Sequence, residues 1–240
     1  MSTPPDPDEA ARRVDAALLA VKAAGLNVQA VMDSSKATEV LDGLDVGSWP
    51  SLLLLGSTGP TMWESMLSVG WMSRPDPVDS WCAAHLSRMR QALPMRAVFV
   101  FPSRAPVDVL ALGRLAGWAH PSPMGLGIHP RHGLWVGYRG AVLLGAHVAE
   151  RGLRTEPSPC ESCVEKPCIS ACPGGAVQVD GLTLATCFAQ RLASTACTTS
   201  CASRRACPVG DGSRYPAAQL AHHQASGNRL YRAYAEAADS

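Results

Sequence analysis

The sequence has few aromatic residues and almost no net charge. Three phenylalanines, four tyrosines and six tryptophans make up 5% of its 240 residues, and the formal net charge is +1 at pH 7. A protein whose main partner is a nucleic acid or an anionic membrane usually carries a basic excess. The composition therefore gives no reason to expect either partner.

Long apolar runs, internal repeats and low-complexity tracts are also absent from the sequence. Leu52–Leu55 is a short run typical of a buried strand, whereas a membrane-spanning helix needs about 20 apolar residues. Residues 1–8 contain neither the basic start nor the apolar core of a secretory signal. We therefore expect a protein of the cytoplasm, where thiols stay reduced.

Hydrophobic residues make up 47% of the chain, enough to build a packed core of the α+β class. Hydrophobic periodicity and the positions of glycine and proline set the expected elements. Helices are predicted at 8–24, from 60 onward, 76–94, 106–118 and 217–237, and strands at 28–31, 51–57, 98–101 and 133–145.

For three of these helices, the sequence also predicts which side chains cap the helix or face the core. Asp6 and Asp76 are expected to cap the helices that follow them. Met62, Met66 and Leu67 should face the core.

Two reactive side chains lie on the predicted helix 76–94. Cys82 lies far in sequence from the other thiols, and we interpret it as a small buried hydrophobe rather than a ligand or nucleophile. His85 is interpreted as a core histidine rather than a catalyst.

Eight of the nine cysteines fall within residues 160–207. The first four read Cys-x2-Cys-x4-Cys-x3-Cys-Pro, close to the ferredoxin signature, in which the second gap is two residues. Thiolates are soft, anionic ligands that suit iron–sulfur clusters. In two-cluster ferredoxins the fourth cysteine of a run binds the other cluster. One predicted 4Fe–4S cluster therefore has the ligands Cys160, Cys163, Cys168 and Cys207, and a second has Cys172, Cys187, Cys197 and Cys201.

Other uses of these thiols compete with this prediction. Disulfides would need an oxidising compartment. Zinc ribbons favour two separated Cys-x2-Cys pairs, and only Cys160 and Cys163 have that spacing. One cluster with spare thiols is a further alternative, because the gaps in the second set are not a ferredoxin repeat.

A family resemblance rests on the stretch GIHPRHGLWVGYRGAVLLG, residues 127–145, and on DPVD…HLSRMRQALP within residues 76–94. A weaker match is Arg214-Tyr215…Gln219. These motifs resemble the CblC family of cobalamin-processing proteins, which includes the methylmalonic aciduria and homocystinuria type C protein. That family is similar in fold to flavin nitroreductases and to the cobalamin domain of epoxyqueuosine reductase, which also carries two ferredoxin-type clusters.

The resemblance implies a nitroreductase-like domain that binds cobalamin with its lower base displaced. The residues that match the cobalamin-contacting motif and its continuation are His129, Pro130, Arg131, Trp135 and Arg139. The alternative is that both residues are structural: His129 would cap a loop, and Arg139 would be the partner in an ion pair. His129 and His132 could also form a metal pair, although two histidines alone rarely make a site.

The cysteine-rich stretch is where the chain departs from the animal members. It stands where they carry arginines associated with glutathione-dependent dealkylation, so the resemblance does not extend that activity here. We expect a cobalamin-binding domain at 1–154, a ferredoxin-like module at 155–212 joined by a proline-rich hinge at 155–159, and a helix packing on the main domain at 213–240.

The leading functional hypothesis is an oxidoreductase that passes electrons from 4Fe–4S clusters to bound cobalamin and removes its upper ligand. Its partners would be a corrinoid and an external electron donor such as a flavodoxin, a ferredoxin or a flavin reductase. Two alternatives are a cobalamin-dependent reductase of another substrate and a non-enzymatic cobalamin carrier with a structural or sensing cluster.

Overall fold

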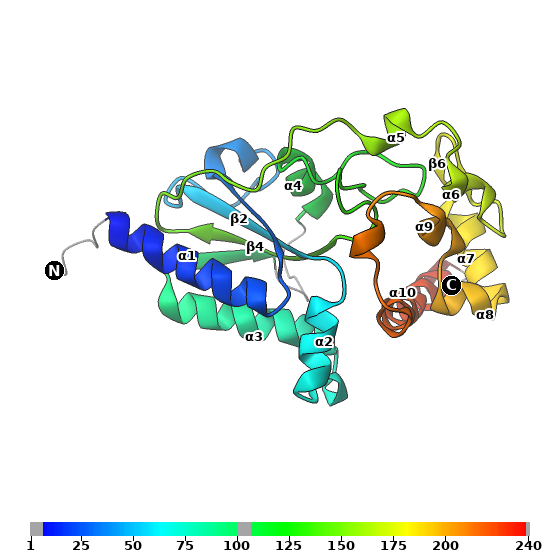
Figure 1. Cartoon of the computed structure of the whole chain (residues 1–240), viewed down its shortest axis with the longest axis horizontal. Coiled ribbons are helices and arrows are strands. Elements are labelled where there is room, and N and C mark those ends of the chain that lie inside the picture. The colour runs from blue at the N-terminus through cyan, green and yellow to red at the C-terminus, as the bar shows by residue number, and fades with distance from the viewer. Residues whose placement is uncertain (1–6, 100–106, 239–240) are drawn as a thin grey trace. The chain divides into compact units, whose positions relative to one another are not determined.

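The computed structural model describes residues 7–99 and 107–238 (Figure 1). Its contacts group into two compact units. The sheet unit consists of Met1–Ala119 and Val136–Glu156, and the cysteine unit consists of His120–Trp135 and Pro157–Ser240. This grouping differs from the expected limits at 154 and 212, because residues 120–135 and the last helix belong with the cysteines. No described helix is long and apolar enough to cross a membrane.

The sheet unit is built on four antiparallel strands in the order β1-β2-β4-β3. Their bounds are β1 Val28–Asp33, β2 Ser51–Ser57, β3 Met95–Phe99 and β4 Gly137–Leu144. The central strand β2 is buried along its whole length. Its run of four leucines therefore fills the core on both faces of the sheet, as expected for a strand covered on two sides.

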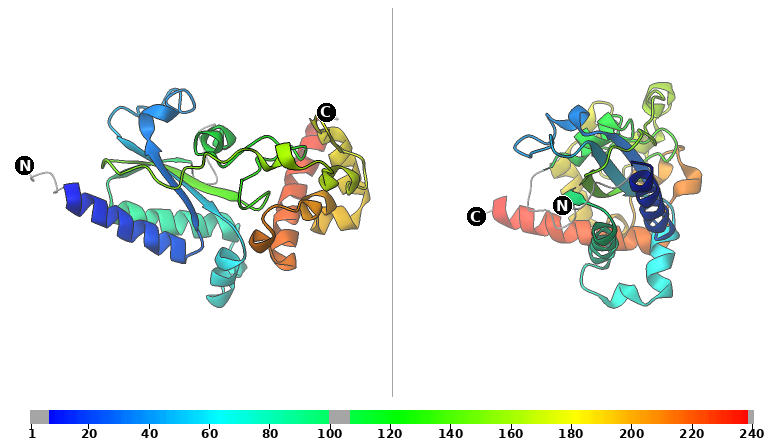
Figure 2. Two further views of the ribbon diagram at one scale, coloured as in Figure 1. Left: turned by 45° about the horizontal axis from the view of Figure 1, so that its top comes forward. Right: turned by 90° about the vertical axis from the view of Figure 1, so that its left-hand side faces the viewer.

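Helices cover each face of this sheet (Figures 1 and 2). Leu53 and Leu55 pack with α1 (Pro7–Ala23), α2 (Thr61–Ser68) and α3 (Pro77–Ala92). Leu52 and Leu54 point the other way, toward α4 (Val109–Leu115) and Trp118. The period of two along β2 thus separates two apolar cores.

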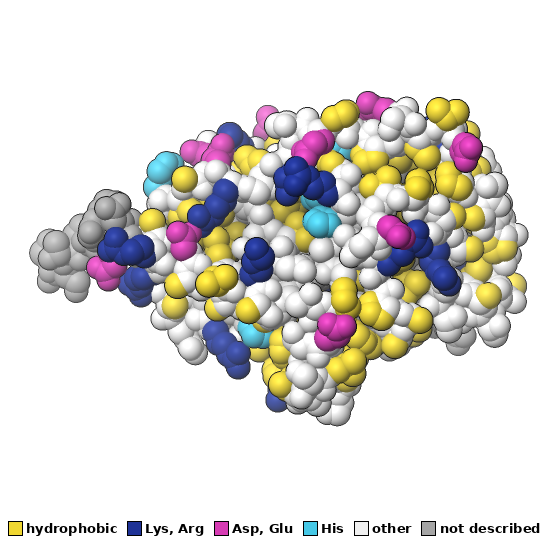
Figure 3. All heavy atoms as spheres, viewed as in Figure 1, with side chains coloured by type: hydrophobic (Ala, Val, Ile, Leu, Met, Phe, Trp, Pro, Cys, Tyr) yellow, Lys and Arg dark blue, Asp and Glu magenta, His cyan; other side chains and the backbone are white. Residues whose placement is uncertain are grey.

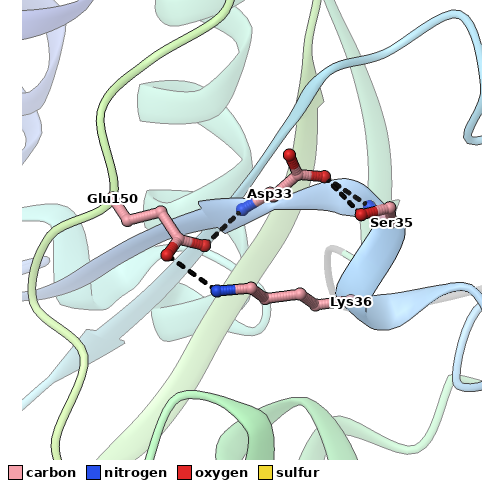
Figure 4. A network of polar contacts seen from close by, with 4 residues as sticks. All are labelled: Asp33, Ser35, Lys36 and Glu150. Atoms are coloured by element: carbon pink, nitrogen blue, oxygen red, sulfur yellow. Dashed lines mark hydrogen bonds and ion pairs between the residues drawn. The ribbon is translucent and has the colours of Figure 1, made fainter.

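A small polar network closes one end of the sheet (Figure 4). The Asp33 carboxylate accepts hydrogen bonds from the backbone N–H and the hydroxyl of Ser35. Asp33 thereby caps the short helix η1 (Ser34–Ala37). Glu150 accepts from the backbone N–H of Asp33 and forms a 2.7 Å ion pair with Lys36. The chain that leaves β4 is thereby tied to the end of β1.

The predicted helices at 8–24 and 76–94 and the strand at 51–57 are confirmed. Two details were wrong. Leu67 is 53% exposed, because the buried face of α2 consists of Met62, Trp63 and Met66. Asp76 precedes α3 with a left-handed φ of 41° and its side chain makes no capping hydrogen bond. Asp6, Phe101 and Pro106 lie outside the described residues.

The prediction of a strand starting at residue 133 was also wrong. β4 begins only at Gly137, because Gly133 turns the chain with a φ of 59° and hydrogen-bonds back to His129. Residues 133–135 therefore stay in the cysteine unit.

The cysteine unit consists of short elements and one long helix. The elements are α5 Pro159–Ser162, α6 Pro167–Ser170, the hairpin of β5 Val177–Gln178 and β6 Gly181–Leu182, α7 Leu184–Ala193, α8 Thr195–Thr199, α9 Ala202–Ala206, η3 Asp211–Ser213 and α10 Ala217–Ala238. The last helix confirms the prediction of a helix at 217–237, and it packs on α8.

Candidate metal and cofactor site

The first three cysteines lie on a loop that Lys166 holds closed. Cys160 is the second residue of α5, and its N–H donates to the hydroxyl of the N-cap residue Ser158 at 3.3 Å. Lys166 adopts a left-handed φ of 41°, and its ammonium donates 3.1 Å hydrogen bonds to the carbonyls of Cys160 and Cys163. Pro167 and Cys168 then start α6. A single cationic side chain thus fixes the backbone on which three predicted ligands stand.

Cys207 joins these three thiols from far along the sequence. Burial raises the pKa of the Cys160 thiol, and the neighbouring Cys207, Cys168 and Cys163 groups raise it further. Cys207 also lies in an apolar cluster with Ile128 and Leu134, against which Cys160 and Cys168 pack. Cys160, Cys168 and Cys207 of the first predicted set therefore share one apolar cluster, which also includes Cys172 and Cys201 of the second set.

The thiols of the second predicted set also lie near one another. Burial raises the pKa of Cys187, Arg191 opposes this effect, and Cys201, Cys172 and Cys197 add to it. All four cysteines line one cavity of about 220 Å³. Cys187 comes from α7, Cys197 from α8 and Cys201 from the residue preceding α9.

Backbone N–H groups surround Cys172. The Ala176 N–H donates to its Sγ at 3.3 Å. Burial works against the thiolate, but backbone N–H groups of Val177, Ala176 and Gly174 hold the pKa of Cys172 below its ordinary value. Such N–H groups stabilise anionic sulfur and are one of the features that set cluster potentials.

None of the nine cysteines forms a disulfide. Within residues 7–99 and 107–238, no three His, Cys, Asp or Glu side chains are placed to hold a single metal ion. Cys82 lies in the core of the sheet unit, where burial raises its pKa to about 11. The interpretation of Cys82 as a buried hydrophobe is therefore confirmed.

His129, the first predicted cobalamin residue, closes a tight loop in the cysteine unit. It is 1% exposed, and its Nδ1 accepts hydrogen bonds from the backbone N–H groups of Arg131 and His132 at 3.1 and 3.2 Å. Its own backbone pairs with Gly133 on both sides of the loop. Pro130 and Arg131 form the tip of this loop, and His132 pairs through Nδ1 with the Ser213 hydroxyl at 2.8 Å.

This loop packs directly on the turn that follows Cys207. A β-carbon on Gly133 would overlap the carbonyl group of Val209, and one on Gly210 would overlap the carbonyl group of His132. Only glycine lets two backbones approach so closely. The loop that carries the cobalamin-type motif is therefore fixed against the turn that carries a predicted cluster ligand.

Trp135 and Arg204 form a second link between these segments. The Arg204 side chain, from α9, donates two hydrogen bonds to the Leu134 carbonyl. Its guanidinium also lies over the rings of Trp135 and Tyr215. Nothing in the sequence patterns singled out Arg204. Its position three residues before Cys207-Pro208 was the available signal, together with the preference of arginine for stacking on aromatic rings.

Arg139 is the one predicted cobalamin residue that lies in the sheet unit. It is on β4, and its Nε donates to the Ser57 hydroxyl at 2.7 Å across the strand pair. The other four lie in the cysteine unit.

Trp135 and Gln219 each carry buried polar atoms without partners among the described residues. The indole Nε1 of Trp135 has no hydrogen-bond partner among the described residues, and neither does either amide atom of Gln219, which is fully buried on α10. A cavity of about 360 Å³ is lined by Trp135, Tyr215 and Leu220, with Arg205 and Arg214 at its side. Unpaired buried donors and acceptors are uncommon, and each costs about 1–3 kcal/mol.

Comparison with known proteins identifies relatives by structure alone. No family profile matches the sequence, and no curated protein matches it. The structure is similar to that of the C. elegans B12-trafficking protein CblC, with a TM-score of 0.49 and 13% identity over 89% of this chain and 92% of that one. It is also similar to epoxyqueuosine reductase from Bacillus subtilis, with a TM-score of 0.51 and 13% identity over 86% of this chain and 68% of that one. At this identity, the likeness to the reductase shows the fold of the chain.

Proposed function

We propose that this protein binds two 4Fe–4S clusters and a cobalamin, and that it reduces the bound corrinoid and so removes an upper axial ligand such as cyanide. The observation that carries the proposal is the contact between the loop of residues 129–133 and the turn of residues 207–210. The motif that resembles a cobalamin site and a predicted cluster ligand belong to one packed unit.

The cysteines fit two clusters in number, grouping and chemistry. Each set supplies four thiols. Those of the second set line one cavity, and Cys160, Cys168 and Cys207 of the first set pack in one apolar cluster. Apolar side chains such as Ile128 and Val177 pack among them, and N–H groups point at Cys172. When bound, such clusters supply electrons one at a time at low potential.

The buried polar atoms of Trp135 and Gln219 match the rim of a corrin in chemistry. Cobalamin is a flat ring fringed with amide groups, each of which offers a donor and an acceptor. The Trp135 indole offers one donor, and Gln219 offers a complementary amide. Hydrogen bonds to the bound molecule would remove the cost of leaving these groups unpaired.

The protein's own residues keep this arrangement rigid. Gly133 and Gly210 allow backbone contact, Arg204 clamps the Leu134 carbonyl, and His129 holds its loop in shape through two N–H groups. The role of this chain is then to hold a corrinoid at a fixed place relative to the cysteines. Arg139 lies in the sheet unit, and it stays a candidate cobalamin residue on the motif alone.

A second candidate is a reductase that uses cobalamin as a cofactor on another substrate. The fold shared with epoxyqueuosine reductase favours it. The two candidates differ in what changes during turnover: the upper ligand of cobalamin is lost in one, and an added organic substrate is consumed in the other. A carrier would change neither.

Anaerobic mixing tests the proposal. Cyanocobalamin added to protein with chemically reduced clusters should lose cyanide without glutathione, as the cluster absorption returns to its oxidised form. The variant Cys160→Ala/Cys163→Ala should still bind the vitamin and leave cyanide attached. Cys82→Ala, which removes a thiol from the sheet unit, is the matched control and should behave as wild type. Intact cyanocobalamin beside reduced clusters would reject the processing role.

A further inference from the structure

Charge is distributed unevenly along the cysteine unit. Residues 157–186 contain the acidic side chains Glu161, Glu165 and Asp180 and one lysine, Lys166. The following residues, 187–214, contain four arginines and a single aspartate. One part of the cysteine unit is therefore acidic and the other basic, although the whole chain is close to neutral.

The basic part contains a groove that reaches a predicted cluster ligand. The groove has a volume of about 520 Å³, and Cys197 and Ser200 form part of its floor. Small apolar residues such as Ala196, Ala202 and Ala206 make up most of the remaining wall, with Arg205 and Arg214 at its side. Figure 3 shows basic side chains gathered over α9. The groove thus combines an apolar floor with a cationic rim.

The two arginines of this rim differ in what they contact. Arg214 is held by Asp211 at 2.6 Å and donates to the carbonyls of Arg205 and Cys207. The exposed side chain of Arg205 makes no hydrogen bond or ion pair with any described residue. Its guanidinium is available to a carboxylate on another molecule.

A second groove, of about 410 Å³, reaches a ligand of the other set. It is lined by Cys160 and Val179, and its charged groups are Glu161, Asp180 and Lys166. The Lys166 ammonium is engaged with two backbone carbonyls, whereas neither carboxylate has a partner among the described residues. This groove therefore presents negative charge and would repel an acidic protein.

We propose that the groove at Cys197 is the docking site of a small acidic electron-carrier protein, and that electrons reach the clusters through the second cysteine set. The inference rests on the proposed function, because it requires a cluster at Cys197. Charge complementarity selects this groove over the one at Cys160 and selects a carrier with carboxylates around its flavin or cluster. For a flavin carrier, one electron leaves the anionic hydroquinone to give the neutral semiquinone, and the core charge of a 4Fe–4S cluster falls from 2+ to 1+. No proton or other atom is transferred.

Rapid anaerobic mixing with a flavodoxin hydroquinone tests this docking site in the cluster-loaded, full-length protein. At low ionic strength, Arg205→Glu should slow the second-order bleaching of the clusters about tenfold or more. The difference from wild type should shrink as salt is added, because exposed charges are screened. Glu161→Lys changes charge by the same amount at the other groove, with the opposite sign, and should not slow the reaction.

A small chemical reductant separates docking from cluster integrity. Dithionite should reduce wild type, Arg205→Glu and Glu161→Lys at equal rates, and all three should contain equal iron. If Arg205→Glu is as fast as wild type with flavodoxin, or if Glu161→Lys alone changes the rate, the docking site at Cys197 is wrong, while the proposed function stands. Absence of iron from anaerobic wild-type protein would instead remove the proposed function.

Discussion

The guanidinium carbon of Arg204 lies 4.5 Å from the centre of the Trp135 ring, while Nε and Nη2 of the same side chain donate to the Leu134 carbonyl at 3.0 and 2.7 Å. Arg204 stands on α9, between Cys201 and Cys207. One side chain therefore connects the helix that separates two predicted cluster ligands with the segment that carries the predicted cobalamin residues.

Replacing Arg204 with lysine should weaken this connection even though the charge is kept. Lysine cannot place two parallel donors on one carbonyl or stack a planar group on the ring. We expect the free energy of unfolding of the cluster-loaded protein to fall by about 1–3 kcal/mol. Anaerobic urea titration followed by tryptophan fluorescence measures the change. Arg205→Lys, an exposed change at the next residue, should leave the unfolding curve in place, and equal losses in both variants would contradict the prediction.

The loop of Cys160–Cys168 should depend on Lys166. Lys166→Met keeps most of the aliphatic chain but removes the hydrogen bonds to the Cys160 and Cys163 carbonyls. A loss of about 1–2 kcal/mol corresponds to a factor of about 5–30, and we expect iron release to a chelator to accelerate by that factor. Lys36→Met is the control, because Lys36 forms its ion pair with Glu150 in the sheet unit, away from the cysteines. Identical release from wild type and Lys166→Met would show that the loop does not rely on the ammonium.

Thiol chemistry should separate Cys168 from Cys82. Anaerobic wild-type protein should be brown and contain about eight irons if both clusters form. Cys168→Ser should lose iron from the first set and destabilise the unit, since small domains lean on their metal for folding. Cys82→Ala should retain all the iron.

Because burial raises the pKa of Cys82 to about 11, the thiolate is scarce near neutral pH, and iodoacetamide should leave Cys82 unmodified until the protein unfolds. Zinc in place of iron would contradict the cluster assignment.

The sequence predicted most of the sheet unit because its elements have strong local signals. Ser51–Ser57 was located by its four leucines, and Pro77 and Pro94 bracket α3. The start of β4 was missed because a strand-like run of apolar residues precedes it. Its true limit depends on the left-handed turn at Gly133 and on the contact with Val209, and neither is visible in a local pattern.

For the candidate site, the division of the cysteines into two sets and their role as cluster ligands stay predictions. The division rests on the two Cys-Pro endings, because in two-cluster ferredoxins the fourth cysteine of a run binds the other cluster. The packing of residues 129–133 on residues 207–210 could not be predicted. Each segment reads as an ordinary loop, and only the fold brings Gly133 and Gly210 to the same place.

The pH dependence of stability should include a contribution from His85. Its ring packs against that of Trp81, with 4.5 Å between the ring centroids. Burial, together with the charge of Arg88, holds the pKa of His85 below its ordinary value. The unfolded state therefore binds a proton more readily than the folded state. The contribution of His85 to the free energy of unfolding is complete above its pKa in the unfolded state, about 6.5. It is lost as the pH falls through its pKa in the folded state. His85→Gln should flatten the fall in unfolding free energy between about pH 7.5 and pH 5. Parallel curves for the variant and wild type would contradict this assignment.

Gln219 allows a ligand role to be separated from a packing role. Its amide is fully buried, and neither Nε2 nor Oε1 has a partner within the described residues. Leucine has a similar volume and no polar group, so Gln219→Leu should stabilise the cobalamin-free protein by about 1–3 kcal/mol. If the amide serves a corrin rim, the same change should weaken hydroxocobalamin binding by a similar free energy, measured by titration of the corrin spectrum. Gln178→Ala, at an exposed position on β5, should alter neither quantity. A more stable variant with unchanged affinity would mean that Gln219 does not contact the corrinoid, and that the family-like Arg214-Tyr215…Gln219 segment serves the packing of α10 alone.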